Sequence, residues 1–326
     1  MTRRPSSGER RARRAENPRI VARVAPLWMC RDNDRPAWAI TAGVPSRTCG
    51  VGSIARREDD GGDLMRSIPA EVLAIAETLN LCLPPPPNQD RVVEPRFAAF
   101  IGVQDEPQHN IVQRLRVAPS EVDATVAEVR ALFRARGRTA LTWEIGPSSA
   151  PADLCERLLA LGMVPDDEPE MAGMILTRAP EKAPNGVVVE RVRTFEQFRV
   201  LKLVYHRCFG RGAKAPTEAE IAADFERRKG KEDHLIRYLA LANGAPIAAA
   251  DAVFIDGAVV LCGGATLPEA RGQGAYRALV QARWEDAIAR RTPVLVVQAG
   301  AMSRPILARM GFEEVVRVRV LLDRLR

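Results

Sequence analysis

The chain has 326 residues, of which 46% are hydrophobic and 27% are charged, a composition and length typical of a globular protein with two domains. Its formal net charge is +7, but residues 1–64 contain thirteen arginines and eight acids, so the rest of the chain carries only +2. This near balance gives no reason to expect a nucleic-acid-binding surface on the rest of the chain. No apolar run approaches the roughly 20 residues of a membrane span, so we expect a cytoplasmic protein with no membrane partner.

Residues 1–64 do not have the pattern of a folded domain, since they are rich in arginine and glycine and contain only short apolar runs. Such a segment buries too little apolar surface to offset the entropy lost on ordering, so we expect a disordered basic tail. Contact of this tail with nucleic acid is one alternative. Another is that the natural chain starts at Met65, where the pattern of a folded protein begins.

From that point the sequence alternates helix and strand patterns, which is typical of an α/β protein with a mixed sheet. A helix is predicted over about 69–81, before the four prolines that end it. The segment 178–186 contains proline and glycine and is typical of a linker. We therefore divide the chain into a tail (1–64), a first half (65–180) and a second half (181–326).

The second half shows a regular succession of elements. A strand at 187–193 precedes helices at 195–209 and 217–229. The apolar runs on either side of Asn243-Gly244 predict a β-hairpin, because this dipeptide favours a type I′ turn, and Asp256-Gly257 makes the next turn. The remaining predicted elements are a strand at 258–266, a helix at about 273–290, a strand at 293–298, a helix at about 303–310 and a strand at 312–322.

Two stretches of the chain repeat the same order of features. Residues 135–163 and 288–312 each run from a basic helix end through a threonine, an apolar strand, a glycine and a small polar loop to a short helix closed by a glycine. In this alignment Gly162 corresponds to Gly311. Duplication of one unit accounts for the common order, although strand–helix units also resemble one another by chance.

The six cysteines form no C-x-x-C pair and the three histidines are scattered, so we expect no metal site. Most of the cysteines lie in apolar runs and are expected to be small core residues rather than nucleophiles. They are Cys30, Cys49, Cys82, Cys155, Cys208 and Cys262.

A glycine loop, Arg271-Gly272-Gln273-Gly274, follows a predicted strand and precedes a predicted helix. The first N–H groups of a helix have no partner within it and carry the positive end of its dipole. Glycines allow a ligand to approach the backbone, so the loop suits a diphosphate, and the arginine can add a charged hydrogen bond. Alternatively, the glycines only make a tight turn between strand and helix.

The context of this loop resembles the GCN5-related N-acetyltransferase (GNAT) family. Two helices, a β-hairpin, a strand with its glycine loop (ATLPEARGQGAY), a long helix, a strand and the segment SRPILARMGF follow one another over about 187–322. Arg271 and Gly274 match the family signature Arg/Gln-x-x-Gly-x-Gly/Ala, whereas Tyr276 stands where a small residue is usual. Gly311 with the following Phe matches the family's other common mark. The resemblance implies a GNAT fold in two tandem copies.

In this family the glycine loop binds the pyrophosphate of acetyl-CoA, and the end of the preceding strand pairs with the pantetheine arm. The thioester lies where the fourth and fifth strands splay apart. The resemblance thus implies acetyl-CoA as a co-substrate. The residues that it implies for CoA binding are Ala265, Thr266, Leu267, Arg271, Gly272, Gln273, Gly274, Ala275, Tyr276 and Ser303.

The first half resembles a degenerate copy of the second. Where the glycine loop would stand, it has Pro119 and Ser120 opening a helix, with no Arg-Gly-x-Gly. Only the second half therefore has a phosphate cradle, and the first half is expected to support it or to wall its substrate cleft.

Many family members use a Glu on the fourth strand as general base and a Tyr on the last helix as general acid. This chain has no acid in its fourth strand, 258–265, and Leu307 stands at the Tyr position. The catalytic candidates that remain are Asp251, Tyr276 and Ser303, followed by Glu269, Tyr205 and His206.

Each candidate has a simpler explanation. Asp251 lies among apolar neighbours, where a charge is costly unless it is paired or used, but its side chain can also simply face water. Tyr276 is expected to pack against CoA, and His206 to lie on a helix surface. Ser303 either bonds the pantetheine arm or caps the last helix. Catalysis by positioning and by backbone N–H groups that polarise the carbonyl is a further alternative.

The sequence therefore predicts transfer of an acetyl group from acetyl-CoA to a primary amine of a small molecule or a peptide. The alternative is a non-catalytic acyl-CoA-binding regulatory protein. An intact glycine loop fits both functions, whereas the missing acid and base favour the regulator.

Overall fold

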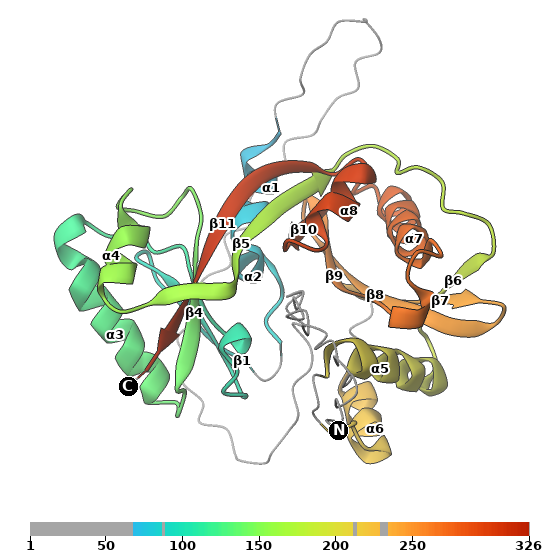
Figure 1. Cartoon of the computed structure of the whole chain (residues 1–326), viewed down its shortest axis with the longest axis horizontal. Helices are drawn as coiled ribbons and strands as arrows, with labels where there is room; N and C mark the ends of the chain where they lie inside the picture. Colours follow the sequence, from blue (N-terminus) through green and yellow to red (C-terminus); the bar gives the residue numbers. More distant parts are fainter. Residues whose placement is uncertain (1–67, 87–88, 211–213, 229–233, 326) are drawn as a thin grey trace, which may run out of the picture.

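The computed structural model describes residues 68–86, 89–210, 214–228 and 234–325. The predictions for the tail, residues 1–64, lie outside these ranges. The described residues form one 11-stranded mixed sheet in the order β1-β2-β3-β4-β11-β5-β10-β9-β8-β7-β6. Helices lie on both of its faces (Figure 1), so the predicted α/β class with a mixed sheet is confirmed.

The first half begins with two helices where one was predicted. Thr78 has φ of −120° and its hydroxyl donates to the carbonyl of Ala74 at 2.9 Å, so the first helix ends at Glu77 and the next begins at Leu79. The elements of this half are α1 (Ala70–Glu77), α2 (Leu79–Cys82), β1 (Gln89–Val93), β2 (Ala98–Gly102), β3 (Asn110–Gln113), α3 (Val122–Arg134), β4 (Ala140–Ile145), α4 (Leu154–Ala160) and β5 (Val164–Leu176).

The second half follows the predicted order, with boundaries shifted by a residue or two. The hairpin turn is confirmed, since Asn243 and Gly244 both have positive φ, at 50° and 77°, as a type I′ turn requires. The elements are β6 (Val187–Arg191), α5 (Phe195–Phe209), α6 (Glu218–Arg228), β7 (Leu235–Ala242), β8 (Ala245–Ile255), β9 (Ala258–Thr266), α7 (Ala275–Ala289), β10 (Leu295–Ala299), α8 (Arg304–Arg309) and β11 (Glu313–Arg324).

The two halves exchange their last strands. β5, which ends the first half, pairs antiparallel with β10 of the second half, from Ala172–Ala299 to Leu176–Leu295. β11, which ends the second half, pairs antiparallel with β4 of the first half and with β5. The two long strands therefore run side by side through the middle of the molecule (Figure 1), and the halves share one continuous sheet.

The internal repeat has the same geometry in both halves. Gly162 follows α4 and Gly311 follows α8, and both have φ of 92°. In each case the N–H of the next residue bonds the carbonyl four residues before the glycine, at 3.2 Å and 3.1 Å. Left-handed closure of this kind ends a helix and suits glycine, which has no Cβ to strain. Both turns lead directly into an exchanged strand, so in each copy this glycine lies where the chain passes from one half of the sheet to the other.

Helix α1 lies across the centre of the sheet, where Val72 and Ile75 share an apolar core with residues of β5, β10 and β11. Gln298 of β10 donates to the carbonyls of Ala76 and Glu77, at 3.1 Å and 2.9 Å. In the second half, α5 and α6 lie on one face of the sheet and α7 and α8 on the other (Figure 1). Strands β8 and β9 are therefore reached by side chains from both faces.

Among the described cysteines, Cys155 and Cys262 are buried as predicted, whereas Cys82 and Cys208 are partly exposed; all are free thiols. The other two cysteines lie outside the described residues. No helix in the described ranges has the length and apolarity needed to cross a membrane.

Candidate active site

Strands β9 and β10 diverge towards their carboxyl ends. They pair in parallel only where Val259–Val260 meets Leu295–Val296, although β9 continues to Thr266 and β10 to Ala299. Beyond that point β9 stays paired with β8, and β10 with β5. The predicted splay is present, and it leaves one edge of β9 without a partner strand among the described residues.

The edge of β9 holds three of the residues predicted to bind the pantetheine arm. Ala265 and Thr266 pair with β8 on one side only, and Leu267 donates its N–H to the carbonyl of Ile247 at 2.9 Å. Backbone groups on the other side of an edge strand are free to pair with an extended ligand. This edge therefore has the geometry that the prediction requires.

A β-bulge interrupts β9 beside the gap. Ala249 pairs with Ala265 and Asp251 with Cys262, so Gly263 and Gly264 together oppose one residue of β8. Gly263 has φ of 60°, the left-handed conformation that a bulge assigns to glycine. A bulge disrupts the regular ladder and turns its residues away from the strand direction, so the backbone of β9 changes course beside the gap.

Two tyrosine side chains pack closely against this bulge. A Cβ built on Gly263 would lie 2.7 Å from the hydroxyl oxygen of Tyr205, and one built on Gly264 would lie 2.7 Å from the ring of Tyr276. Tyr205 comes from α5 and Tyr276 from α7, so the two rings approach from opposite faces of the sheet (Figure 1). Only glycines allow both rings to come this close.

Asp251 faces the protein interior. Its side chain is 2% exposed and accepts a 2.9 Å hydrogen bond from the hydroxyl of Tyr205, so the alternative that it simply faces water is wrong. Burial raises the pKa of Tyr205 well above its usual range, and the Asp251 carboxylate raises this pKa further. The phenol therefore stays protonated and acts as a hydrogen-bond donor to the carboxylate.

Two arginines lie close to this pair. Arg283 of α7 is 1% exposed and donates to the backbone carbonyls of Leu279 at 2.9 Å and Asp251 at 3.3 Å. Arg237 of β7 stands opposite Asp251 in the strand register. Nothing in the local sequence pattern indicated either arginine, because both lie in otherwise ordinary strand and helix stretches.

The glycine loop has the features of an anion site. Helix α7 begins after Gly274, which has φ of 83°, and it has neither a side-chain cap nor an acid in its first turn. Gly272 has φ of 81°, and a Cβ built there would meet nothing within 4 Å. Arg271, Gly272 and Gln273 are exposed, and among the described residues the Arg271 guanidinium has no hydrogen bond or ion pair. Ala275 is buried and anchors the first turn in the core.

The linker crosses over the start of α7. A Cβ built on Gly274 would lie 2.7 Å from Pro184, and the N–H of Ala183 donates to the side chain of Gln281 at 2.8 Å. Gly274 is therefore needed for contact with the linker as well as for the loop conformation, whereas Gly272 faces open space.

The other candidates take different positions. Ser303 precedes α8, but its hydroxyl donates to the carbonyl of Gly300 at 3.4 Å and makes no cap, so the capping alternative is wrong. Glu269 is exposed and pairs with Arg207 at 2.7 Å. His206 packs beside Gly210 at the end of α5.

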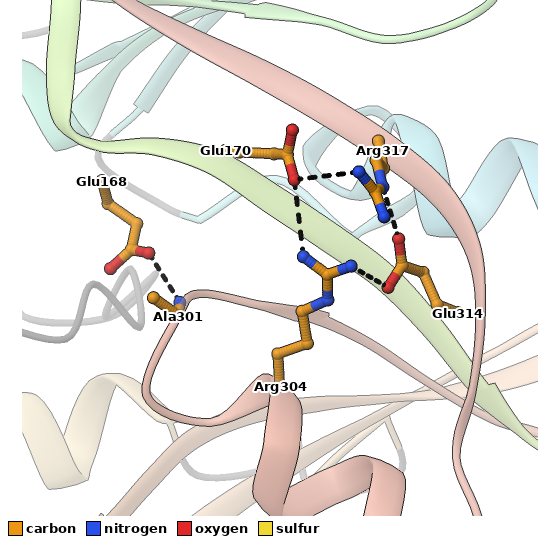
Figure 2. Close-up of polar contacts among 6 residues, drawn as sticks. All are labelled: Glu168, Glu170, Ala301, Arg304, Glu314 and Arg317. Carbon is orange, nitrogen blue, oxygen red and sulfur yellow. Dashed lines mark hydrogen bonds and ion pairs between the residues drawn. The ribbon is translucent and has the colours of Figure 1, made fainter.

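A buried acid that the sequence reasoning missed lies beyond the end of β10. Glu168 of the exchanged strand β5 is 4% exposed, and its carboxylate accepts the N–H of Ala301 at 2.6 Å (Figure 2). Arg304 of α8 lies between two further carboxylates, those of Glu170 and Glu314 (Figure 2). The first half therefore holds the loop that carries Ser303. Glu168 and Ala301 are 133 residues apart in the sequence, so no local pattern predicts their contact.

The equivalent place in the first half is closed. Strands β3 and β4 pair up to Gln113 and Glu144, whose side chains are hydrogen-bonded to each other. The next residues stay joined, since the N–H of Ala150 bonds the carbonyl of Leu115 at 2.8 Å. At the start of α3, the Glu121 carboxylate accepts the N–H of Ala118 at 3.0 Å. An acid of the chain thus lies beside this helix start, where it would repel an anionic ligand.

No profile of a known protein family and no curated protein matches the chain. Solved structures do match. A GCN5-related N-acetyltransferase from Kribbella flavida has a TM-score of 0.59 at 19% identity, covering 77% of this chain and 95% of that one. A tandem GNAT protein from the clavulanic acid biosynthesis pathway has a TM-score of 0.54 at 17% identity, covering 79% and 89%. A GCN5-related N-acetyltransferase from Sphaerobacter thermophilus has a TM-score of 0.54 at 16% identity, covering 72% and 82%.

At these identities the likeness concerns the fold. The exchanged strands, the splayed pair and the repeated glycine closure agree with it. The chain therefore has the GNAT fold, the acyl-CoA N-acyltransferase fold, built as two copies in tandem.

Proposed function

We propose that this protein transfers an acetyl group from acetyl-CoA to a primary amine of a small molecule or a peptide. The observation that carries the proposal is the gap between β9 and β10, which lies beside the uncapped glycine loop of α7. A long ligand bound here would have one end at the glycine loop, which suits an anion, and the other end at the bulged edge of β9. This is the arrangement that a thioester on a diphosphate carrier requires.

The residues present fit acetyl-CoA. The N–H groups of Gly272, Gln273 and the first turn of α7 would hold its diphosphate, with Arg271 as a charged donor. The free edge of β9 at 265–267 would pair with the pantetheine arm. Bound acetyl-CoA supplies an electrophilic thioester. A backbone N–H at the Gly263 bulge would polarise its carbonyl, as an oxyanion-type donor does.

The Tyr205–Asp251 pair is the proton acceptor in this proposal. A free tyrosinate is ruled out near neutral pH, because burial holds the pKa of Tyr205 well above 10. Its phenolic oxygen can instead take a proton from the amine while its own proton passes to the Asp251 carboxylate. Tyr276 packs over Gly264 and Ser303 lies in the loop after β10, so both would orient the acyl carrier.

The first half would support this site rather than bind a second acetyl-CoA. Its own strands are closed at Gln113–Glu144, and Glu168 holds the loop after β10. We therefore propose that residues 65–180 form the degenerate copy and residues 181–326 the acetyl-CoA-binding copy.

A non-catalytic acyl-CoA-binding regulator is the second candidate. It is favoured by the absence of an acid in β9 and by Leu307, which is fully buried where the family's Tyr would stand. Release of free thiol from acetyl-CoA with a panel of amines separates the two candidates. Turnover with any amine supports the enzyme. Binding of CoA, seen as a rise in Tm at millimolar CoA, without turnover across the panel supports the regulator. No rise in Tm contradicts both.

A further inference from the structure

A cavity lies in the second half among residues of β6, α5, α6 and β7. Its volume is about 330 Å³, and its lining includes five arginines and no acid among the residues that the structure describes. We call it the arginine pocket; the arginines are Arg191, Arg193, Arg228, Arg237 and Arg290. Arg290 directly follows α7, whose other end carries the glycine loop. The helix has 15 residues, which separates the two places by roughly 20 Å.

One of these arginines is buried without a full set of partners. Arg237 is 9% exposed, and its Nη2 atom has no hydrogen-bond partner. Its guanidinium carbon lies 5.4 Å from the ring centroid of Phe198, which holds the group in place. Burial lowers the pKa of Arg237, but arginine remains charged. Asp251 and Asp224 already attract this guanidinium, but a buried N–H without a hydrogen-bond partner is costly, so Nη2 of Arg237 is a donor that an anion in the pocket would satisfy.

The other arginines are held in place or accessible. Asp286 fixes Arg191, and Asp224 accepts from Arg228 at 2.6 Å. Arg193 is exposed, and within the described ranges its guanidinium has no hydrogen bond or ion pair. Asp286 and Asp224 are thus already engaged, Asp224 with Lys202 and Arg227 as well as Arg228, and the described residues that line the pocket include no acid.

We propose that the arginine pocket binds a small phosphorylated metabolite at a site separate from that of acetyl-CoA. Planar guanidinium groups match the oxygens of a phosphate two at a time, and several around one space suit a dianion better than a single carboxylate. The volume falls within the range of small-molecule sites. The proposal does not depend on acetyl transfer, since it rests on Arg237 and its neighbours alone.

Calorimetric titration of the full chain with inorganic pyrophosphate, at constant ionic strength, tests the proposal. Because the glycine loop also suits a diphosphate, we expect two binding events. Arg193→Gln and Arg237→Gln should each weaken one event by roughly tenfold or more and leave the other unchanged. Arg271→Gln should do the reverse. Arg309→Gln, on the exposed face of α8, should change neither.

Arg193 is exposed, so its substitution does not risk unfolding the chain even if Arg237→Gln does. Pyrophosphate binding that only Arg271→Gln weakens would overturn the arginine pocket and leave the acetyl-CoA proposal intact. Binding that only the Arg193 and Arg237 variants weaken would support the pocket and count against the glycine loop. Citrate binding more tightly than pyrophosphate at the Arg193-dependent event would overturn the assignment to phosphate.

Discussion

The hydroxyl of Tyr205 donates a 2.9 Å hydrogen bond to Oδ1 of Asp251, and its oxygen lies where a Cβ on Gly263, in the bulge of β9, would clash with it. One residue comes from α5 and the other from β8. A buried carboxylate and a phenol that stays protonated thus lie beside the bulge of β9, at the gap between β9 and β10. The proposed proton transfer runs through this pair.

Tyr205→Phe should lower kcat by roughly a hundredfold, the usual scale for loss of acid–base assistance, while the KM for acetyl-CoA stays near wild type. Asp251→Asn should have a similar effect, and the double variant should lose little more, because the two groups act as one relay. Tyr238→Phe is the control, since Tyr238 is also buried and donates to an aspartate, Asp286, at 2.6 Å. An equal loss of kcat in the control would show that buried tyrosines matter only for stability.

Stability should fall at alkaline pH. Burial raises the pKa of both Tyr205 and Tyr238 above the usual value of 10.0. Above pH 10 the unfolded chain releases protons that the folded chain keeps, so the free energy of unfolding decreases by up to about 1.4 kcal/mol per pH unit for each tyrosine. Below pH 10 both states keep these protons and the contribution is constant. Urea unfolding at pH 9, 10 and 11 measures the slope, which Tyr205→Phe should flatten; an unchanged slope in that variant contradicts the assignment.

Substitutions at Gly272 can test whether the glycine loop binds the diphosphate of CoA, because two variants there differ only in charge. Asn and Asp have nearly the same shape and both tolerate the left-handed conformation, and a Cβ at this position meets nothing within 4 Å. Gly272→Asp should bind CoA at least roughly tenfold more weakly than Gly272→Asn, because a carboxylate near the diphosphate repels it. Calorimetric titration with CoA measures the difference.

Ser120→Asp and Ser120→Asn, at the corresponding helix start of the first half, should show no such difference. Equal CoA affinity of the two Gly272 variants would rule out the loop as the diphosphate site. Gly274→Glu is a poorer test, because its side chain would meet Pro184 of the linker and disturb the packing as well as the ligand.

Neither half should fold alone. A fragment of residues 65–180 deprives β5 of both its neighbours, β10 and β11, and a fragment of residues 181–326 deprives β11 of both its neighbours, β4 and β5. Each fragment would expose unpaired strand edges and apolar surface. We expect native circular dichroism and a discrete complex on gel filtration only when both fragments are produced together. A soluble, monomeric fragment 181–326 that binds CoA would show that each half can close its own sheet.

Asp323 fastens the end of β11 to the first half. It is 1% exposed and accepts two 2.9 Å hydrogen bonds from Arg130 and one of 3.2 Å from the indole of Trp143. Asp323→Ala should reduce the free energy of unfolding by about 3–5 kcal/mol, because it leaves a partly buried guanidinium unpaired. Glu313→Ala, at an exposed position on the same strand, should change it by less than about 0.5 kcal/mol. Urea unfolding compares the two; similar small losses would mean that the Asp323 contacts add little.

The sequence by itself determined most of the elements of the second half and the place of the glycine loop, because those signals are local. Asn243-Gly244 encodes its turn in two residues, and Thr194 with Gln197 forms a capping box within the first turn of α5. The repeated Gly162 and Gly311 were visible for the same reason. The interruption at Thr78 was missed, since it depends on a single residue within an otherwise continuous helical pattern.

Only the tertiary structure decided which strands meet. The local patterns of β5 and β11 predict strands but not their neighbours, and the exchange of the two strands follows from packing across the whole sheet. The same holds for Asp251, whose strand is buried on both faces, so that periodicity cannot say which way it points. Its partner Tyr205 lies 46 residues away, and Glu168 reaches the loop after β10 from the other copy. A buried polar group needs a hydrogen-bond partner that is close in space, and that partner can be distant in sequence. Such contacts therefore form only when the whole sheet has folded, and local sequence patterns do not predict them.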